Sequence, residues 1–305
     1  MANCTVRYGT LTALDDLSLE ISPGEAFGFI GPNGAGKSTT MKILAGLLRP
    51  DTGRATVDGL DVVTRSQDVR RRVGYMPDFL GVYDDLTVDE YLQFFASAFK
   101  VKRSKRAGLV SEILELTDLT TKRHAMVDSL SRGMQQRLGI ARVLIHDPKV
   151  LLLDEPASGL DPRARIEMRS LLVELRRMGK TIMVSSHILS ELHEMCSSIG
   201  IIEQGKLLFA GTLDDAFARA GSAQRIHLRL ETDAASALRA IETDERVHAA
   251  KIVNDELVLE LTPGTHAHHF VFERLTAAGA RIASFTPREE KLEDVFLRLT
   301  KGAVQ

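Results

Sequence analysis

A glycine-rich segment near the start of the chain has the residue types and the spacing of a phosphate-binding loop. Residues 31–39 fit G-x-x-x-x-G-K-[ST] and follow an apolar run, Ala26 to Gly31 (AFGFIG), that predicts a buried strand. Glycines let the main chain wind tightly, so that its N–H groups and the N-terminus of the next helix face phosphate oxygens. We therefore predict that nine residues bind a nucleoside triphosphate: Gly31, Pro32, Asn33, Gly34, Ala35, Gly36, Lys37, Ser38 and Thr39.

Within this loop, Lys37 and Ser38 have distinct predicted roles. The lysine neutralises the β- and γ-phosphates, and the Ser38 hydroxyl binds Mg²⁺. The alternative is a glycine-rich turn in which G-K-S occurs by chance. The strand before the loop and the helix that we predict after it, Lys37 to Leu48, favour the phosphate site.

Two adjacent acids follow a second apolar run, Val150 to Leu153. Ligands bind at the carboxyl ends of the strands in open α/β sheets, which would bring these acids beside the phosphate loop. We predict that Asp154 binds Mg²⁺, directly or through water, and that Glu155 polarises the attacking water. A strand that simply ends in two surface acids is the alternative.

A third apolar run, Thr181 to Ser185, leads to His187. A lone histidine is more often structural than catalytic. Because His187 lies at the same predicted sheet edge as the other candidates, we count it with Glu155 and Lys37 as a catalytic residue.

The elements that must position these residues alternate between strands and helices, which indicates an α/β domain with a largely parallel sheet. The run Arg163 to Met178 predicts another helix, and residues 78–146 read as an inserted helical subdomain. We predict a nucleotide-binding domain over residues 1–210.

Residues 211–305 show a separate pattern of predicted strands and helices. We predict a linker over residues 211–225 and an accessory α+β domain over residues 226–305. Its predicted elements follow the β-α-β-β-α-β order of a ferredoxin-like domain. They are strands at Ile226 to Leu230, in two runs within Val247 to Leu261, and at Arg281 to Phe285, and helices at Ala234 to Ile241, Phe270 to Ala278 and Leu292 to Leu299.

Composition excludes several classes of protein. A net charge of −2 denies the chain the basic field of a dedicated nucleic-acid binder, so we expect no nucleic-acid partner. Two cysteines, Cys4 and Cys196, are too few for a disulfide framework. No apolar run reaches the roughly 18 to 20 residues of a membrane-spanning helix. We therefore expect a cytoplasmic protein.

A further motif, Leu130-Ser131-Arg132-Gly133-Met134, precedes the Asp154 strand. With it, the chain resembles the ATP-binding-cassette (ABC) ATPases. Their L-S-G-G-Q signature is matched at Leu130, Ser131 and Gly133 and differs at Arg132 and Met134. The resemblance implies a P-loop NTPase fold with a RecA-like core, a helical subdomain and an antiparallel β edge. It also gives Tyr8 the adenine-stacking role, Asp161 a place in the D-loop and His187 the switch role.

The resemblance implies a head-to-tail dimer, in which the signature of one copy completes the ATP site of the other. The signature lies at the start of a predicted helix, Met134 to Ile145, whose N-terminus favours anions. The family's Q-loop glutamine would follow the strand Val73 to Met76, where this chain has Asp78. An ionised carboxylate accepts hydrogen bonds only, so Asp78 joins Ser38 and Asp154 as a candidate Mg²⁺ ligand.

The N-terminal edge differs from the family's usual pattern. A strand usually precedes the adenine-stacking aromatic, and seven residues precede Tyr8 here. The resemblance therefore does not establish how the edge sheet packs.

The C-terminal segment Leu292 to Thr300 also resembles the tail of ABC-2-type exporter ATPases. From these resemblances we expect the ATP-hydrolysing subunit of an ABC exporter of the ABC-2 type. It would use ATP and Mg²⁺, form a homodimer, and be held at the cytoplasmic face of a membrane by separate permease subunits. Two alternatives remain at this point. One is a soluble ABC-class ATPase acting on ribosomes or DNA, and the other is a regulatory nucleotide-binding protein without turnover, which Glu155 and His187 argue against.

Overall fold

The computed structural model describes residues 1–79, 81, 83, 85–186, 192, 195–219, 225–262, 265, 267–288 and 300. The chain forms two compact units, one containing Met1–Leu213 and Thr300–Gln305 and the other Asp214–Leu299. Residues 211–219 belong to regular elements, the end of a strand and a helix, although we predicted a linker there.

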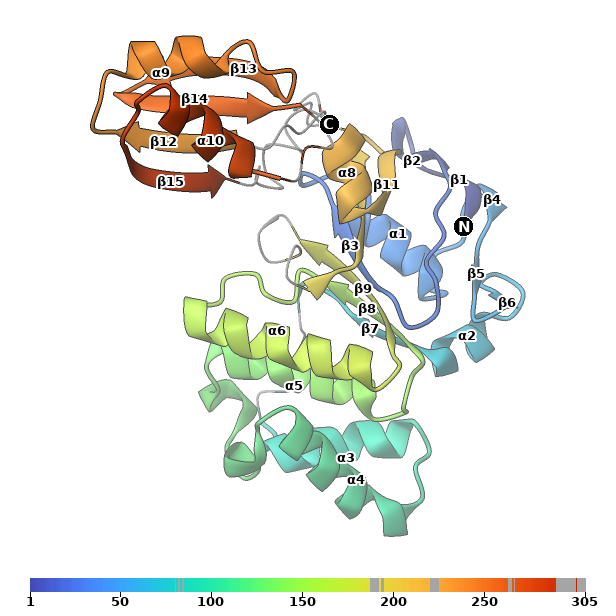
Figure 1. Ribbon diagram of the computed structural model, residues 1–305. Helices are drawn as coiled ribbons and strands as arrows, with labels where there is room; N and C mark the ends of the chain where they lie inside the picture. The colour runs from blue at the N-terminus through green and yellow to red at the C-terminus, as the bar shows by residue number, and fades with distance from the viewer. Residues whose placement is uncertain are drawn as a thin grey trace. The chain divides into compact units, whose positions relative to one another are not determined.

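The first unit is built on a six-stranded sheet with the order β11-β10-β3-β9-β8-β7 (Figure 1). Its strands are β3 (Ala26–Ile30), β7 (Val73–Met76), β8 (Val150–Asp154), β9 (Thr181–Ser186), β10 (Ser198–Glu203) and β11 (Lys206–Thr212). Every neighbouring pair is parallel except β10 and β11. Every residue of β3 is buried, as a strand covered on both faces requires. The predicted parallel α/β core is confirmed.

Helices connect these strands: α1 (Lys37–Leu44), α2 (Ser66–Arg72), α3 (Val88–Ala98), α4 (Arg103–Leu116), α5 (Arg132–Leu144) and α6 (Pro162–Arg177), with short 3₁₀ turns at Thr120–Lys122 and Val127–Ser129. Helices α3, α4 and α5 pack on one another, and α5 runs beside α6 (Figure 1). Helix α1 ends four residues before the predicted Leu48, because Leu47 and Leu48 both turn back to donate to the Lys42 carbonyl.

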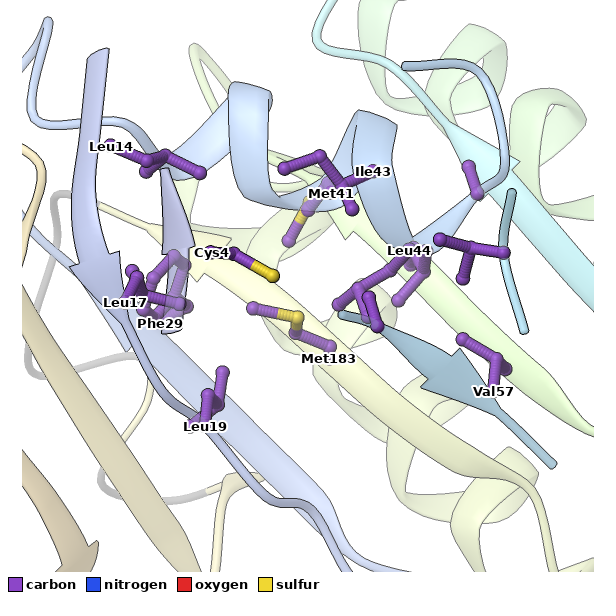
Figure 2. Close-up of a cluster of buried hydrophobic side chains, with 14 of the residues drawn as sticks. Cys4, Leu14, Leu17, Leu19, Phe29, Met41, Ile43, Leu44, Val57 and Met183 are labelled. Carbon is purple, nitrogen blue, oxygen red and sulfur yellow. The ribbon is translucent and has the colours of Figure 1, made fainter. Parts of the chain in front are cut away.

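A second sheet in this unit is antiparallel, with the order β2-β1-β4. Its strands are β1 (Ala2–Tyr8), β2 (Leu11–Leu17) and β4 (Thr52–Arg54), and a two-stranded ribbon, β5 (Thr56–Val57) and β6 (Leu60–Asp61), follows. The residues before Tyr8 therefore do form a strand, β1, which pairs with β2 on one side and β4 on the other. Figure 2 shows the core between this sheet, α1 and the central sheet, where Leu14, Met41 and Met183 converge.

The boundary between the units falls after the first residue of α8 (Leu213–Arg219). The second unit continues with β12 (Arg225–Leu230), α9 (Ala234–Ile241), β13 (Val247–Val253), β14 (Glu256–Leu261), α10 (His269–Ala277) and β15 (Ile282–Arg288). Its sheet is antiparallel with the order β13-β14-β12-β15, which is the ferredoxin-like arrangement that we predicted. The apolar faces of α9 and α10 form its core with β12 and β14. The predicted helix Leu292 to Leu299 lies outside the described residues.

No helix in the described part of the chain combines the length and the apolar character that crossing a membrane requires.

One buried carboxylate, that of Asp244, connects several elements of the second unit through hydrogen bonds. Asp244 lies between α9 and β13 and accepts two hydrogen bonds of 2.8 Å from the Arg246 guanidinium and a third, of 3.3 Å, from Arg274 Nε on α10. The Arg246 guanidinium in turn lies 3.9 Å above the Phe270 ring. These hydrogen bonds, first those from Arg246, hold the pKa of Asp244 well below its usual range.

We expect this carboxylate to make the second unit sensitive to acid. A depressed carboxyl pKa stabilises the fold above the unfolded-state pKa, near 4, and the stabilisation is lost as the pH falls below it. Asp244→Asn should destabilise the fold by about 2 kcal/mol at pH 7, and this difference should shrink steadily below about pH 4. Calorimetric melting of the whole chain across this range measures both effects. Asp255→Asn, in the exposed β13–β14 turn, is the control. A difference that did not vary with pH would contradict the assignment.

Candidate functional site

The glycine-rich loop joins β3 to α1, and close packing against β2 fixes its shape. Gly36 precedes the first residue of α1 with a φ of +109°, a conformation that L side chains rarely adopt. A Cβ atom on Gly36 would lie 2.7 Å from the Ala13 carbonyl oxygen and 2.6 Å from Leu14 Cδ2. The last glycine of the motif is therefore needed both for its backbone conformation and for the approach of β2.

Lys37 lies at the centre of the site and is almost completely buried, with 6% of its surface exposed. Its ammonium group donates hydrogen bonds to the carbonyls of Gly31, at 2.6 Å, and Pro32, at 3.2 Å. The same Nζ atom lies 3.6 Å from Glu155 Oε1. The structure thus brings together two of the three predicted catalytic residues.

The electrostatics of Lys37 reflect this position. Burial lowers the pKa of its ammonium group, because a charge is less stable away from water. The negative charges of Glu155, Asp154 and Asp78, in that order, act in the opposite direction and favour the charged lysine. All three acids therefore lie close enough to Lys37 for their charges to raise the pKa of its ammonium group.

The two acids at the end of β8, Asp154 and Glu155, are held by a residue that our sequence analysis missed. The Ser185 hydroxyl, on the neighbouring strand β9, donates a 2.6 Å hydrogen bond to Asp154 Oδ1. Its oxygen also accepts a 2.9 Å hydrogen bond from the Glu155 N–H. Both Asp154 and Ser185 are buried. The sequence did hold a signal for this role, because Ser185 places a hydroxyl at the end of an otherwise apolar run that predicts a core strand.

Glu155 turns the chain away from β8. Its φ is +50°, a left-handed conformation that costs an ordinary residue on the order of 1 kcal/mol. The N–H bond to Ser185 and a hydrogen bond of 3.0 Å from the Ser158 N–H to the Glu155 carbonyl hold this turn on both sides. The carboxylate is consequently directed toward Lys37 rather than along the strand.

The other predicted ligands differ in their exposure to solvent. Ser38 is exposed in the first turn of α1, Asn33 and Gly34 are exposed at the tip of the loop, and Ala35 is buried beneath it. Thr39 is half-buried. Tyr8, at the end of β1, leaves half of its side chain exposed. His187 lies outside the described residues.

The signature residues start α5. Leu130 is buried, and the Ser131 hydroxyl caps the helix by accepting a 3.4 Å hydrogen bond from the Met134 N–H. The helix begins at Arg132, two residues before the predicted start at Met134, because this cap lies at Ser131. Asp161 caps α6 in the same way, accepting a 2.9 Å hydrogen bond from the Ala164 N–H.

A family model described as ABC transporter matches residues 14–158. The linearmycin resistance ATP-binding protein LnrL of Bacillus subtilis (strain 168) is 31% identical to this chain over 303 residues, which cover 98% of the chain and 96% of that protein. The Nod factor export ATP-binding protein I of Paraburkholderia xenovorans (strain LB400) is 36% identical over 298 residues, with 98% and 95% covered.

The fold is also similar to that of a solved ATP-binding cassette, MJ0796, in a dimeric structure of a post-hydrolysis state bound to ADP and Pi. The TM-score is 0.63 with 26% sequence identity, over 70% of this chain and 97% of that one. This structural similarity extends over 70% of the chain, whereas the sequence similarity to the two relatives extends over 98% of it.

Removing the Ser185 hydroxyl tests whether it orients the acidic pair. Ser185→Ala should lower the kcat of nucleotide hydrolysis by about 10- to 100-fold, the equivalent of one hydrogen bond to a charged group. The KM should change little, because Ser185 contacts the two acids rather than the loop. Steady-state kinetics measure both constants, with Ser170→Ala on the exposed face of α6 as the control. An unchanged kcat would show that β8 alone positions the acids.

Proposed function

Because this chain belongs to the family of ABC transporter ATP-binding proteins, we propose that it hydrolyses ATP to drive export through membrane-spanning subunits on separate chains. The ATPase fold and the nucleotide-binding class follow from the family, and the roles of individual residues are our proposal. The observation that carries it is the group formed by Lys37, Glu155 and Asp154, in which a buried cation lies against one carboxylate and a neighbouring strand orients the other.

In this mechanism the chain contributes position and charge. The main-chain N–H groups of residues 31–39, apart from Pro32, which has none, and the Lys37 ammonium bind the β- and γ-phosphates, and Tyr8 stacks on the adenine. Glu155 polarises the attacking water, and His187 acts at the γ-phosphate beside it. Phosphoryl transfer requires mainly alignment and charge stabilisation, which a buried, preorganised site supplies.

The donor atoms around Asp154 fit Mg²⁺. Carboxylate and hydroxyl oxygens are the ligands that this ion prefers, and it is usually held by one or two carboxylates together with substrate phosphates. We assign the ligand roles to Ser38, Asp154 and Asp78. The ion would neutralise charge that develops on the phosphates.

We propose that two copies bind ATP between them, with Ser131 and Gly133 of one copy facing the phosphates bound by the other. Two features support this arrangement. The signature begins a 13-residue helix, α5, whose N-terminus favours an anion. The similar cassette MJ0796 was solved as a dimer.

The export direction and the membrane partner rest on the relatives and on one surface. The names of both relatives describe ATP-binding proteins, one of linearmycin resistance and one of Nod factor export. Near α3, Tyr83 and Phe94 are each about half exposed and contact one another with ring centroids 5.5 Å apart, while Phe79 is 85% exposed. Exposed aromatic side chains of this kind mark interaction sites. We propose that a permease subunit docks here and holds the chain at the cytoplasmic face of the membrane.

Replacing the proposed base tests the hydrolytic mechanism. Glu155→Gln should retain ATP binding, lose about 100-fold or more of its kcat, and accumulate as an ATP-bound dimer, because the site can close but not turn over. Steady-state hydrolysis and gel filtration with ATP measure these effects. Glu174→Gln on α6 is a matched control, since that acid is exposed and far along the helix from the site. Near-normal turnover of Glu155→Gln would rule out the assignment.

A second experiment tests the partner. A tagged copy should co-purify with an integral membrane protein encoded by the same organism, and Phe94→Asp should lower that recovery by about tenfold, because burying an unpaired charge in an apolar interface is costly. Ile166→Asp, at an equally exposed apolar position on α6, should have no effect. Recovery with ribosomes or DNA instead would favour a soluble ABC-class ATPase.

A further inference from the structure

Arg132, one of the two signature residues that differ from the family pattern, lies against the segment that follows Glu155. A Cβ atom on Gly159 would lie 2.4 Å from Arg132 Cζ and 2.5 Å from its Nη1. The guanidinium therefore rests directly on the Gly159 main chain. Gly159 has a φ of +69°, so the position accepts glycine for its backbone conformation as well as for this contact.

A second contact runs beside the first. A Cβ atom on Gly133 would lie 2.9 Å from the Ala164 Cβ in the first turn of α6 and 3.9 Å from Leu160 Cδ2. Two consecutive signature residues thus pack on the D-loop and on the start of α6. A shift of the α5 N-terminus must therefore move this segment or break both contacts.

The segment on which they pack is tightly connected to Glu155. The Ser158 N–H donates to the Glu155 carbonyl at 3.0 Å, and the Leu160 N–H donates to the Ala157 carbonyl at 3.3 Å. The Asp161 side chain then caps α6. A short hydrogen-bonded turn therefore leads from Gly159 back to the carboxylate beside Lys37.

We propose that Arg132 is a positioning residue that links the signature of one chain to the Glu155 of the same chain. This inference rests on the proposed function, in which the signature contacts ATP bound by the other copy. Binding of that ATP would fix the start of α5, and Arg132 would transmit this through Gly159 to the turn that holds Glu155. The two ATP sites of the dimer would thereby become coupled in hydrolysis.

The chemistry of the contact requires arginine in particular. A guanidinium is planar and weakly hydrated, so it can stack flat on the peptide group of Gly159, whereas a lysine ammonium is a compact, strongly hydrated charge. If Arg132 acted only as a positive charge toward phosphate, lysine would replace it. If it acts by packing on Gly159, lysine will not.

The test uses the 305-residue chain with ATP and four variants: Arg132→Gly, Arg132→Lys, Gly159→Ala and the double variant Arg132→Gly/Gly159→Ala. Gly179→Ala is the matched control for backbone conformation, because Gly179 also has a positive φ, +84°, but nothing lies within 4 Å of its Cβ position. For each variant we would measure kcat, KM and the Hill coefficient for ATP. Hydrogen exchange of the Ser158 and Leu160 amides would be measured without nucleotide.

We expect Arg132→Gly and Arg132→Lys to lower kcat about fivefold or more and to reduce the Hill coefficient toward 1, with KM within about twofold of the wild type. Both should speed exchange of the two amides. Gly159→Ala should lower kcat more in the presence of Arg132 than in its absence, beyond the effect of Gly179→Ala.

Three outcomes would overturn the coupling: additive effects at positions 132 and 159, full rescue by lysine, or unchanged amide exchange in Arg132→Gly. A wild-type chain that binds but does not hydrolyse ATP would contradict the proposed function instead. The exchange of the Ser158 and Leu160 amides would still decide whether Arg132 positions the turn.

Discussion

The site depends on one constraint, which is that the Lys37 ammonium is charged and buried at the same time. Burial disfavours the charge, so the surroundings must supply compensating hydrogen bonds and negative groups. Two loop carbonyls accept hydrogen bonds from Nζ, and Glu155 lies 3.6 Å away. The shape of the glycine-rich loop and the direction of the chain after β8 can both be understood as ways of meeting this requirement.

Meeting it draws on three strands that are far apart in the sequence. β3 ends at the loop, β8 ends at the acids, and β9 contributes the hydroxyl between them. Because these strands are parallel neighbours, all three ends lie at one edge of the sheet, where ligands of such folds bind. The left-handed turn at Glu155 is tolerated because hydrogen bonds from Ser185 and Ser158 compensate for its cost.

Sequence reasoning succeeded where a feature is local. The loop motif, the apolar strand runs and the β-α-β-β-α-β order each depend on residues close together in the chain, and the structure has the strands and the ferredoxin-like topology at those places. It did not reveal contacts between distant segments, such as Ser185 with Asp154 or Arg132 with Gly159, because nothing local distinguishes their partners. The end of α1 was missed for a related reason, since backbone turns after Leu44 and not side-chain periodicity decide it.

This chain differs in charge from its family's motifs at Asp78 and Arg132, and both residues affect the pair formed by Lys37 and Glu155. Asp78 replaces a neutral amide, and its charge favours the protonated form of the buried Lys37. Arg132 replaces a glycine and lies on the segment that follows Glu155, whose carboxylate is 3.6 Å from that lysine. A site with one more carboxylate depends more strongly on cations to hold a polyanionic substrate, because like charges would otherwise repel. The charge at Lys37 is therefore set jointly by its neighbouring acids and by the segment that positions Glu155.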